Sequence, residues 1–291
     1  MAYLANPQNT MAILKKYDLT AQKKYGQNFL IDANVLEKII SGAEIGKEDC
    51  VLEIGPGIGT LTQYLAEAAG RVAAVEIDRH LLPALEDTLS SYNNVTVINE
   101  DILKADIGQI AEKYHGGRAI KVVANLPYYI TTPVILRLLE CGVPIESITV
   151  MIQKEVADRM GAGPGSKDYG ALSLAVQYYA SPQILMQVSA NCFFPRPGVD
   201  SAVIRLAGYE TPPVTVQDAK QMFALIRAAF NQRRKTLVNS LANAGDLQVS
   251  KAQVSDALMK MGLSATVRGE TLTLKEFAEL SDRLTAVNTS A

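Results

Sequence analysis

Residues from about 34 to 208 alternate between short apolar runs and longer stretches with helical periodicity. The apolar runs are rich in valine and isoleucine, which is typical of strands buried on both faces. They lie at 50–54, 72–77, 95–98, 120–124 and 148–152, with helical patterns such as 60–69 and 79–90 between them. Such repeated strand–helix–strand units predict a parallel sheet with helices on both faces. A final pair of runs, 183–192 and 201–207, predicts a hairpin-like end to this sheet.

The pattern changes after the proline pair Pro212 and Pro213. Apolar residues then recur with a helical period over 216–230. Two capping-box spacings predict the starts of further helices, and these are Ser250 with Gln253 and Thr273 with Glu276. Gly262 is expected to end a helix, and the Gly-, Pro- and Ser-containing segment 161–170 is expected to form a flexible loop.

These patterns together predict an α/β fold with a doubly wound, mostly parallel, Rossmann-like sheet and a smaller all-helical C-terminal domain. We expect a basic N-terminal arm over 1–28, the α/β domain over 29–210 and the helical domain over 214–291. No internal repeat is evident in the sequence.

Composition excludes several classes of protein. The three cysteines, Cys50, Cys141 and Cys192, lie far apart and only two histidines are present, which excludes a disulfide scaffold and argues against a metal site. No run approaches the roughly 20 apolar residues that span a bilayer, and the N-terminus has no signal pattern. The sequence therefore predicts a cytoplasmic protein without a metal or a membrane partner.

The net charge of −2 does not indicate a nucleic-acid-binding protein, but basic residues cluster in two segments. Residues 1–28 hold Lys15, Lys16, Lys23 and Lys24, and residues 217–240 hold Lys220, Arg227, Arg233, Arg234 and Lys235. These clusters are either solvated helix faces or surfaces that attract a polyanion.

The first predicted strand runs into a glycine-rich turn, Gly55-Pro56-Gly57-Ile58-Gly59. Glycines let the backbone turn sharply and approach a ligand closely. Thr60 stands where the dinucleotide fingerprint has its third glycine, so this loop alone could be an ordinary tight turn. Glu76 follows Gly55 by about 20 residues and ends the second strand, where an acidic side chain can bind ribose hydroxyls. Asp101 follows the third strand, so the three strand ends together predict an adenosine pocket.

The fourth strand ends in residues 125–128 (NLPY), at the edge where open α/β sheets bind ligands. The Asn125 side-chain oxygen and the Leu126 carbonyl, fixed by Pro127, could accept both protons of one exocyclic amine. Tyr128 then offers a flat face on which a base can stack. A simple proline turn is the alternative, but it does not explain the glycine loop and the two carboxylates that precede it. A nicotinamide dehydrogenase has no use for such an amine clamp.

The glycine loop, Glu76, Asp101 and the NLPY segment resemble those of class I S-adenosylmethionine methyltransferases that modify amino groups. Three further segments narrow the resemblance to the KsgA (RsmA) type of ribosomal RNA adenine dimethyltransferases. These segments are 27–30 (QNFL), 127–130 (PYYI) and 193–203 (FFPRPGVDSAV). The resemblance covers nearly the whole chain, including the helical tail.

This resemblance implies dimethylation of two adjacent adenosines in the 3′-terminal hairpin of small-subunit ribosomal RNA, with S-adenosylhomocysteine as the second product. It implies that the partner is the immature small ribosomal subunit and that the chain acts as a monomer. The residue roles it implies are Asn28, Leu30, Gly55, Gly57, Glu76, Asp101 and Asn125 for cofactor binding, Asn125, Leu126, Pro127, Tyr128 and Phe194 for holding the target adenine, and Lys23, Lys24, Arg233, Arg234 and Lys235 for RNA phosphates.

Two related functions stay open on the sequence alone. The Erm type resembles this family but methylates large-subunit RNA, and segment 193–203 together with the start of the tail favours the KsgA type. A non-catalytic RNA-binding assembly factor could keep the fold, although the intact NLPY segment argues for activity.

Overall fold

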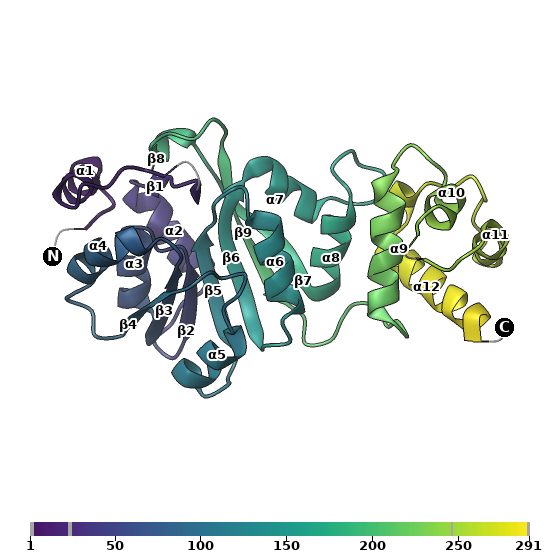
Figure 1. Ribbon diagram of the computed structural model, residues 1–291, viewed down its shortest axis with the longest axis horizontal. Coiled ribbons are helices and arrows are strands. Elements are labelled where there is room, and N and C mark those ends of the chain that lie inside the picture. Colours follow the sequence, from purple (N-terminus) through teal and green to yellow (C-terminus); the bar gives the residue numbers. More distant parts are fainter. Residues whose placement is uncertain (1–2, 23–24, 246, 290–291) are drawn as a thin grey trace. The chain divides into compact units, whose positions relative to one another are not determined.

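The computed structural model describes residues 3–22, 25–245 and 247–289 (Figure 1). The chain forms two compact units: unit 1 comprises residues 1–157 and 181–208, and unit 2 comprises 158–180 and 209–291. Unit 2 therefore includes a segment that the sequence grouped with the sheet, because helix α8, Ala171–Tyr179, packs on helices of the tail. The assignment of separate roles to the arm and the two domains stays a prediction.

Unit 1 is built on the predicted sheet. Seven strands lie in the order β4-β3-β2-β5-β6-β9-β7, and all neighbours from β4 to β6 are parallel. Their bounds are Cys50–Ile54 (β2), Arg71–Glu76 (β3), Val95–Asn99 (β4), Ile120–Asn125 (β5), Ile145–Gln153 (β6), Ala180–Val188 (β7) and Ser201–Gly208 (β9). Each predicted run overlaps one of these strands, but the run 183–192 extends beyond the end of β7 into a 3₁₀ turn, Ala190–Cys192. The doubly wound, mostly parallel fold with a helical C-terminal part is confirmed.

Both faces of the central strands are buried. Val51, Val72 and Val123 lie in one apolar cluster with residues of helices α2 and α3. Successive side chains of a strand point to opposite faces, so Leu52 and Val122, each almost fully buried, belong to the other face. Burial on two faces accounts for the continuous apolar runs in the sequence.

The end of the sheet carries a small second sheet. Strand β9 pairs antiparallel with β6 and has β7 as its other neighbour, as the predicted hairpin-like pair requires. Between β7 and β9, strand β8 (Phe193–Phe194) pairs antiparallel with β1 (Phe29–Leu30) near the N-terminus. This pairing joins two segments that lie more than 160 residues apart in the chain.

The helices of unit 1 lie around the sheet, and α3 to α6 connect its parallel strands (Figure 1). They are α1 (Pro7–Lys16), α2 (Ala33–Gly42), α3 (Thr60–Ala68), α4 (Leu82–Thr88), α5 (Ile107–His115) and α6 (Thr131–Glu140), and α7 (Lys154–Gly161) continues into unit 2. The predicted helical stretch 79–90 divides into a 3₁₀ turn, Arg79–Leu81, and α4, whose second residue is Pro83. Proline is tolerated in a first helical turn because its missing N–H would have no intrahelical partner there.

Unit 2 is helical in its described residues. Besides α8 it contains α9 (Ala219–Asn231), α10 (Leu237–Ala242), α11 (Lys251–Lys260) and α12 (Leu274–Thr289). Both predicted capping boxes form, at the starts of α11 and α12. Gly262 follows α11 with a φ of 73° and ends that helix as predicted. Helix α9 begins at Ala219 rather than near 216, because the Asp218 side chain caps it by accepting from the Gln221 N–H.

The predicted loop 161–170 lies between α7 and α8 and is tied to the rest of unit 2. The Gly165 N–H donates to the Glu270 carbonyl at 2.8 Å, and the buried Tyr169 hydroxyl donates to the Leu272 carbonyl at 2.8 Å. None of the helices in the described ranges is long and apolar enough to cross a bilayer.

Candidate active site

The register of the parallel strands brings the predicted site residues to one level of the sheet. Ile54 on β2 is aligned with Val75 on β3 and with Ala124 on β5. The residues that follow these three, namely Gly55, Glu76 and Asn125, therefore lie side by side at the carboxyl edge. Sequence spacing predicts the strand ends, and this pairing shows that they share one edge.

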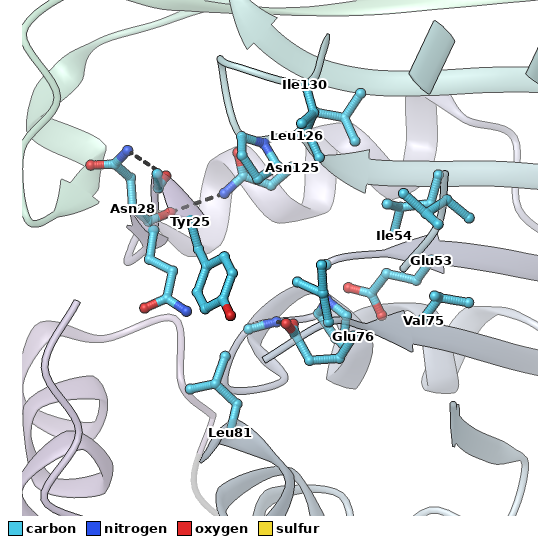
Figure 2. A pocket seen from close by; sticks show the side chains of 18 of the residues that line it. Tyr25, Asn28, Glu53, Ile54, Val75, Glu76, Leu81, Asn125, Leu126 and Ile130 are labelled. Carbon is cyan, nitrogen blue, oxygen red and sulfur yellow. Dashed lines mark hydrogen bonds between the residues drawn. The ribbon is translucent and has the colours of Figure 1, made fainter. Parts of the chain in front are cut away.

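A cavity of about 260 Å³ opens at this edge (Figure 2). All the cofactor residues expected from the sequence line it, and so do four of the five residues expected to hold the target adenine. These lining residues are Asn28, Leu30, Gly55, Gly57, Glu76, Asp101, Asn125, Leu126, Pro127 and Tyr128. The fifth, Phe194, does not line the cavity.

The first three residues of the glycine loop, Gly55 to Gly57, line the cavity. Positive φ and close packing favour glycine at the second and third glycine positions. Gly57 and Gly59 both have positive φ, 64° and 94°. A Cβ on Gly57 would lie 3.3 Å from the Phe29 ring, and one on Gly59 would lie 3.0 Å from the Thr88 hydroxyl. A Cβ on Gly55 would instead project into open space, which leaves that backbone accessible to a ligand.

Glu76 is held rigidly at the end of β3. It is 4% exposed, and its two carboxylate oxygens accept from the Gly57 N–H at 3.1 Å and the Asp78 N–H at 2.8 Å. Burial raises the pKa of Glu76, while these backbone hydrogen bonds act in the opposite direction. Each oxygen keeps a second lone pair, so the carboxylate can accept hydrogen bonds from a ligand in the cavity.

The loop after β4 is held by a hydrogen bond within the loop and by two hydrogen bonds from helix α6. The Asp101 carboxylate accepts from the Leu103 N–H at 2.9 Å. From helix α6, Arg137 donates to the Ile102 carbonyl at 3.1 Å and to the Ala105 carbonyl at 2.6 Å. The loop that brings Asp101 to the cavity is thus braced by a helix that follows the NLPY segment.

Asn125 makes the central contact of the site. Its side-chain nitrogen donates to the Asn28 carbonyl at 3.0 Å, as the dashed line in Figure 2 shows. A carbonyl oxygen can only accept, so the amide must present its NH₂ group to Asn28. The side-chain oxygen of Asn125 is therefore left as an acceptor for a group in the cavity.

Residues 25–30 line the cavity and contact both the NLPY segment and the residues after β3. Gly26 has a φ of 58°, and a Cβ added to it would lie 3.4 Å from the Pro127 side chain. The Gln27 side chain donates to the buried Asp78 carboxylate at 3.1 Å, and the Asn28 side chain donates to the Gly26 carbonyl at 3.0 Å. This segment explains why QNFL belongs to the same site as NLPY. Lys23 and Lys24, which precede it, lie outside the described residues.

The two aromatic residues expected to sandwich a base sit differently. Tyr128 is half-buried and lines the cavity, and burial raises the pKa of its hydroxyl. Phe194 is 40% exposed and lies on β8, where it is paired with Phe29 of β1. Phe29 packs against the glycine loop, so Phe194 belongs to the same part of unit 1 without lining the cavity itself.

Glu53 is a site residue that the sequence analysis did not assign. It is 1% exposed, lines the cavity, and has a carboxyl oxygen without a hydrogen-bond partner among the described residues. Figure 2 shows its side chain directed toward Glu76. Burial, reinforced by the Glu76 carboxylate, raises the pKa of Glu53 to about 8. An acidic residue within an otherwise apolar strand was the signal that could have identified it.

The predicted basic cluster of the tail lies in a turn between α9 and α10. Arg234 and Lys235 are exposed as expected. Arg233 is also exposed, but its guanidinium donates to the Lys167 carbonyl at 3.2 Å and to the Tyr169 carbonyl, and it lies over the Phe230 ring. Arg233 therefore holds the loop 161–170 in place, and the contact with RNA phosphates that the resemblance implies for it stays a prediction.

The cavity residues fit S-adenosylmethionine. The open space beside Gly55 leaves room for part of the ligand to lie against the backbone. Glu76 offers buried acceptors for two ribose hydroxyls. Asp101 lies farther along the same edge, where it lines the cavity as the adenine-binding residue should. No group of three or more histidine, cysteine or acidic side chains in the described part of the chain is arranged to hold a metal ion.

The raised pKa of Glu53 predicts how the free energy of unfolding depends on pH. In the unfolded chain a glutamate has a pKa of about 4.3. Between roughly pH 5 and 8 the native state therefore holds one proton more than the unfolded state, so stability should fall as pH rises, by up to about 1.4 kcal/mol per unit. Glu53→Gln should remove this slope in the free energy of unfolding, measured with denaturant at several pH values. The exposed residue Glu86, changed to Gln, is the control, and identical slopes for all three proteins would contradict the prediction.

The sequence is similar to those of known ribosomal RNA methyltransferases. The family model described as ribosomal RNA adenine dimethylase matches residues 18–281. The ribosomal RNA small subunit methyltransferase A of Lachnoclostridium phytofermentans is 63% identical over 97% of this chain and 98% of its own length. The protein of the same name from Alkaliphilus metalliredigens is 53% identical over 98% of this chain and 99% of its own length.

Solved structures agree with the fold as well. A dimethyladenosine transferase from Plasmodium falciparum is similar with a TM-score of 0.71 and 26% identity, covering 87% of this chain and 95% of its own. The 23S rRNA methyltransferase ErmE is similar with a TM-score of 0.66 and 27% identity, covering 89% and 100%. The length and identity of the sequence matches are decisive: the chain belongs to the ribosomal RNA adenine dimethylase family.

Proposed function

We propose that this chain is an S-adenosylmethionine-dependent enzyme that dimethylates the N6 amines of two adjacent adenosines in the 3′-terminal hairpin of small-subunit ribosomal RNA. The observation that carries the proposal is the orientation of Asn125, whose amide oxygen is left to accept a hydrogen bond in the same cavity as the glycine loop and Glu76. The 63% identity to a protein named for the small subunit favours this RNA over the large-subunit RNA of the Erm type.

The residues of the cavity align the reactants rather than activate them. When bound, S-adenosylmethionine supplies a methyl group on a positively charged sulfur, so no strong base is needed. The Asn125 side-chain oxygen and the Leu126 carbonyl accept from the target amine and stabilise the positive charge that develops on its nitrogen. Holding the amine in one orientation lowers the entropic part of the barrier. After the first transfer one N–H is lost, so the second transfer has one hydrogen bond fewer to orient the amine.

The target base has to leave its stack before its amine can reach the cavity. Tyr128, at the cavity, and Phe194, on β8, are the aromatic residues proposed to hold the flipped adenine. Stacking of a base on an aromatic side chain is worth roughly 1–3 kcal/mol. The chain is proposed to act in the cytoplasm, as a monomer, on the immature small subunit.

The proposal is tested by mapping methyl groups. The protein would be incubated with radiolabelled S-adenosylmethionine and either unmethylated small subunits or large subunits. We expect N6,N6-dimethyladenosine at the two adjacent positions of the 3′-terminal hairpin. Label on the large subunit would favour the Erm-type function, and tight subunit binding without transfer of label would favour a non-catalytic assembly factor.

Glu76→Ala is expected to weaken cofactor binding. The variant loses the charged acceptor proposed for the ribose, and hydrogen bonds to charged groups are worth about 1.5–3 kcal/mol. Calorimetry with S-adenosylmethionine measures the loss, which should be roughly 10- to 100-fold in Kd. Glu86→Ala, an exposed change on helix α4, serves as the control. Unchanged affinity in a folded Glu76→Ala protein would remove Glu76 from the cofactor site.

The basic turn of unit 2 is proposed to contact RNA phosphates through Arg234 and Lys235. Replacing both with Ala should weaken subunit binding and reduce the slope of log affinity against log salt by about 0.7–0.9 per lost contact. Cofactor affinity should not change. The control Lys251→Ala/Lys260→Ala removes the same charge from helix α11 of the same unit. Equal salt slopes for both double variants would contradict the assignment.

The role of Arg233 in RNA binding needs a separate measurement because its side chain also braces the loop 161–170. Its replacement by Ala should therefore lower the thermal stability of the chain in addition to any effect on RNA.

A further inference from the structure

Ser201 is the first residue of strand β9 and lies in the segment 193–203. It is 0% exposed, and its position is aligned with Gln153 of β6. The sequence pattern FFPxPxVDSAV includes this serine, but the proposed function assigns it no task. Its Oγ lies 2.9 Å from the Tyr128 hydroxyl, within hydrogen-bond distance.

The backbone around Ser201 is held on both sides. The preceding Asp200 accepts from the Ala190 N–H through its carboxylate at 3.0 Å, and its carbonyl accepts from the Lys154 N–H at 3.1 Å. Pairing of β9 with β6 then fixes Ser201 itself. The serine hydroxyl is therefore a fixed point to which the half-buried Tyr128 ring is tied at its far end.

Segment 193–203 also carries Phe194, the second aromatic residue proposed to hold the flipped adenine. Phe194 lies near its start, where β8 pairs with β1. One stretch of chain thus fixes Phe194 through backbone pairing and Tyr128 through a side-chain hydrogen bond. A tyrosine ring without such a bond can rotate about its side-chain torsions, and a base stacks well only on a ring held in a suitable plane.

We propose that Ser201 is a positioning residue that holds the Tyr128 ring in the orientation needed to stack the flipped adenine. The inference rests on the proposed function. Ser201 does not line the cavity and acts only through the Tyr128 hydroxyl. Loss of the bond should therefore lower kcat for methyl transfer and leave the KM for RNA and the Kd for S-adenosylmethionine close to those of the unmodified protein.

The test is a double-mutant cycle with Ser201→Ala, Tyr128→Phe and the double variant. Each single change removes the same hydrogen bond. A hydrogen bond contributes about 1 kcal/mol, which corresponds to about a fivefold change in rate. Each should lower kcat by about five- to tenfold, and the double variant should be no slower than the slower single one. Because Tyr128→Phe leaves Ser201 in place, it tests the bond even if Ser201→Ala folds poorly.

Ser240→Ala is the matched control, since Ser240 is also buried and its hydroxyl has no hydrogen-bond partner in the described part of the chain. It should leave kcat unchanged. Two results would overturn the inference: a kcat for Ser201→Ala equal to that of the unmodified protein, or losses in the two single variants that multiply in the double variant. Failure of the proposed function would look different, because the unmodified protein would then transfer no methyl group to small subunits, and that result would remove both claims.

Discussion

The hydrogen bond from the Asn125 side chain to the Asn28 carbonyl connects the two halves of the active site. Asn125 ends a central strand of the sheet, and Asn28 belongs to the segment that passes over the cavity. The bond has two consequences. It holds residues 25–30 against the NLPY segment, and it decides which atom of the amide is left for a ligand. An amide turned the other way would place two oxygens against each other and present donors to an amine that also donates.

The positions of the other site residues depend on the register of the parallel sheet. Register alone puts Gly55, Glu76 and Asn125 at one level, although 70 residues separate the first and the last. Hydrogen bonds then fix each group: backbone N–H donors hold Glu76, Arg137 holds the loop that carries Asp101, and Ser201 holds Tyr128. These hydrogen bonds restrict the movement of the cavity's polar groups, and dipoles that are held in place stabilise developing charge effectively.

Much of this could be predicted from the sequence, because parallel strands buried on two faces leave continuous apolar runs and binding residues follow them directly. Such runs predict the strands, the glycine loop, Glu76 and the NLPY segment. Contacts that depend on tertiary packing leave no such pattern in the sequence. Arg233 looks like a free cation in the sequence, yet its guanidinium binds carbonyls of a loop more than 60 residues earlier. The grouping of α8 with the tail and the hydrogen bond between Ser201 and Tyr128 likewise depend on distant segments that no local pattern records.

The most direct test of this account is the replacement of Asn125 by Asp. The carboxylate keeps acceptor oxygens but cannot donate to the Asn28 carbonyl, so the bond that orients the side chain is lost. We expect kcat for methyl transfer to fall by roughly 100-fold, as for removal of one preorganised polar group, and hydrogen exchange in residues 25–30 to become faster. Turnover and exchange equal to those of the unmodified protein would show that this hydrogen bond does not organise the site.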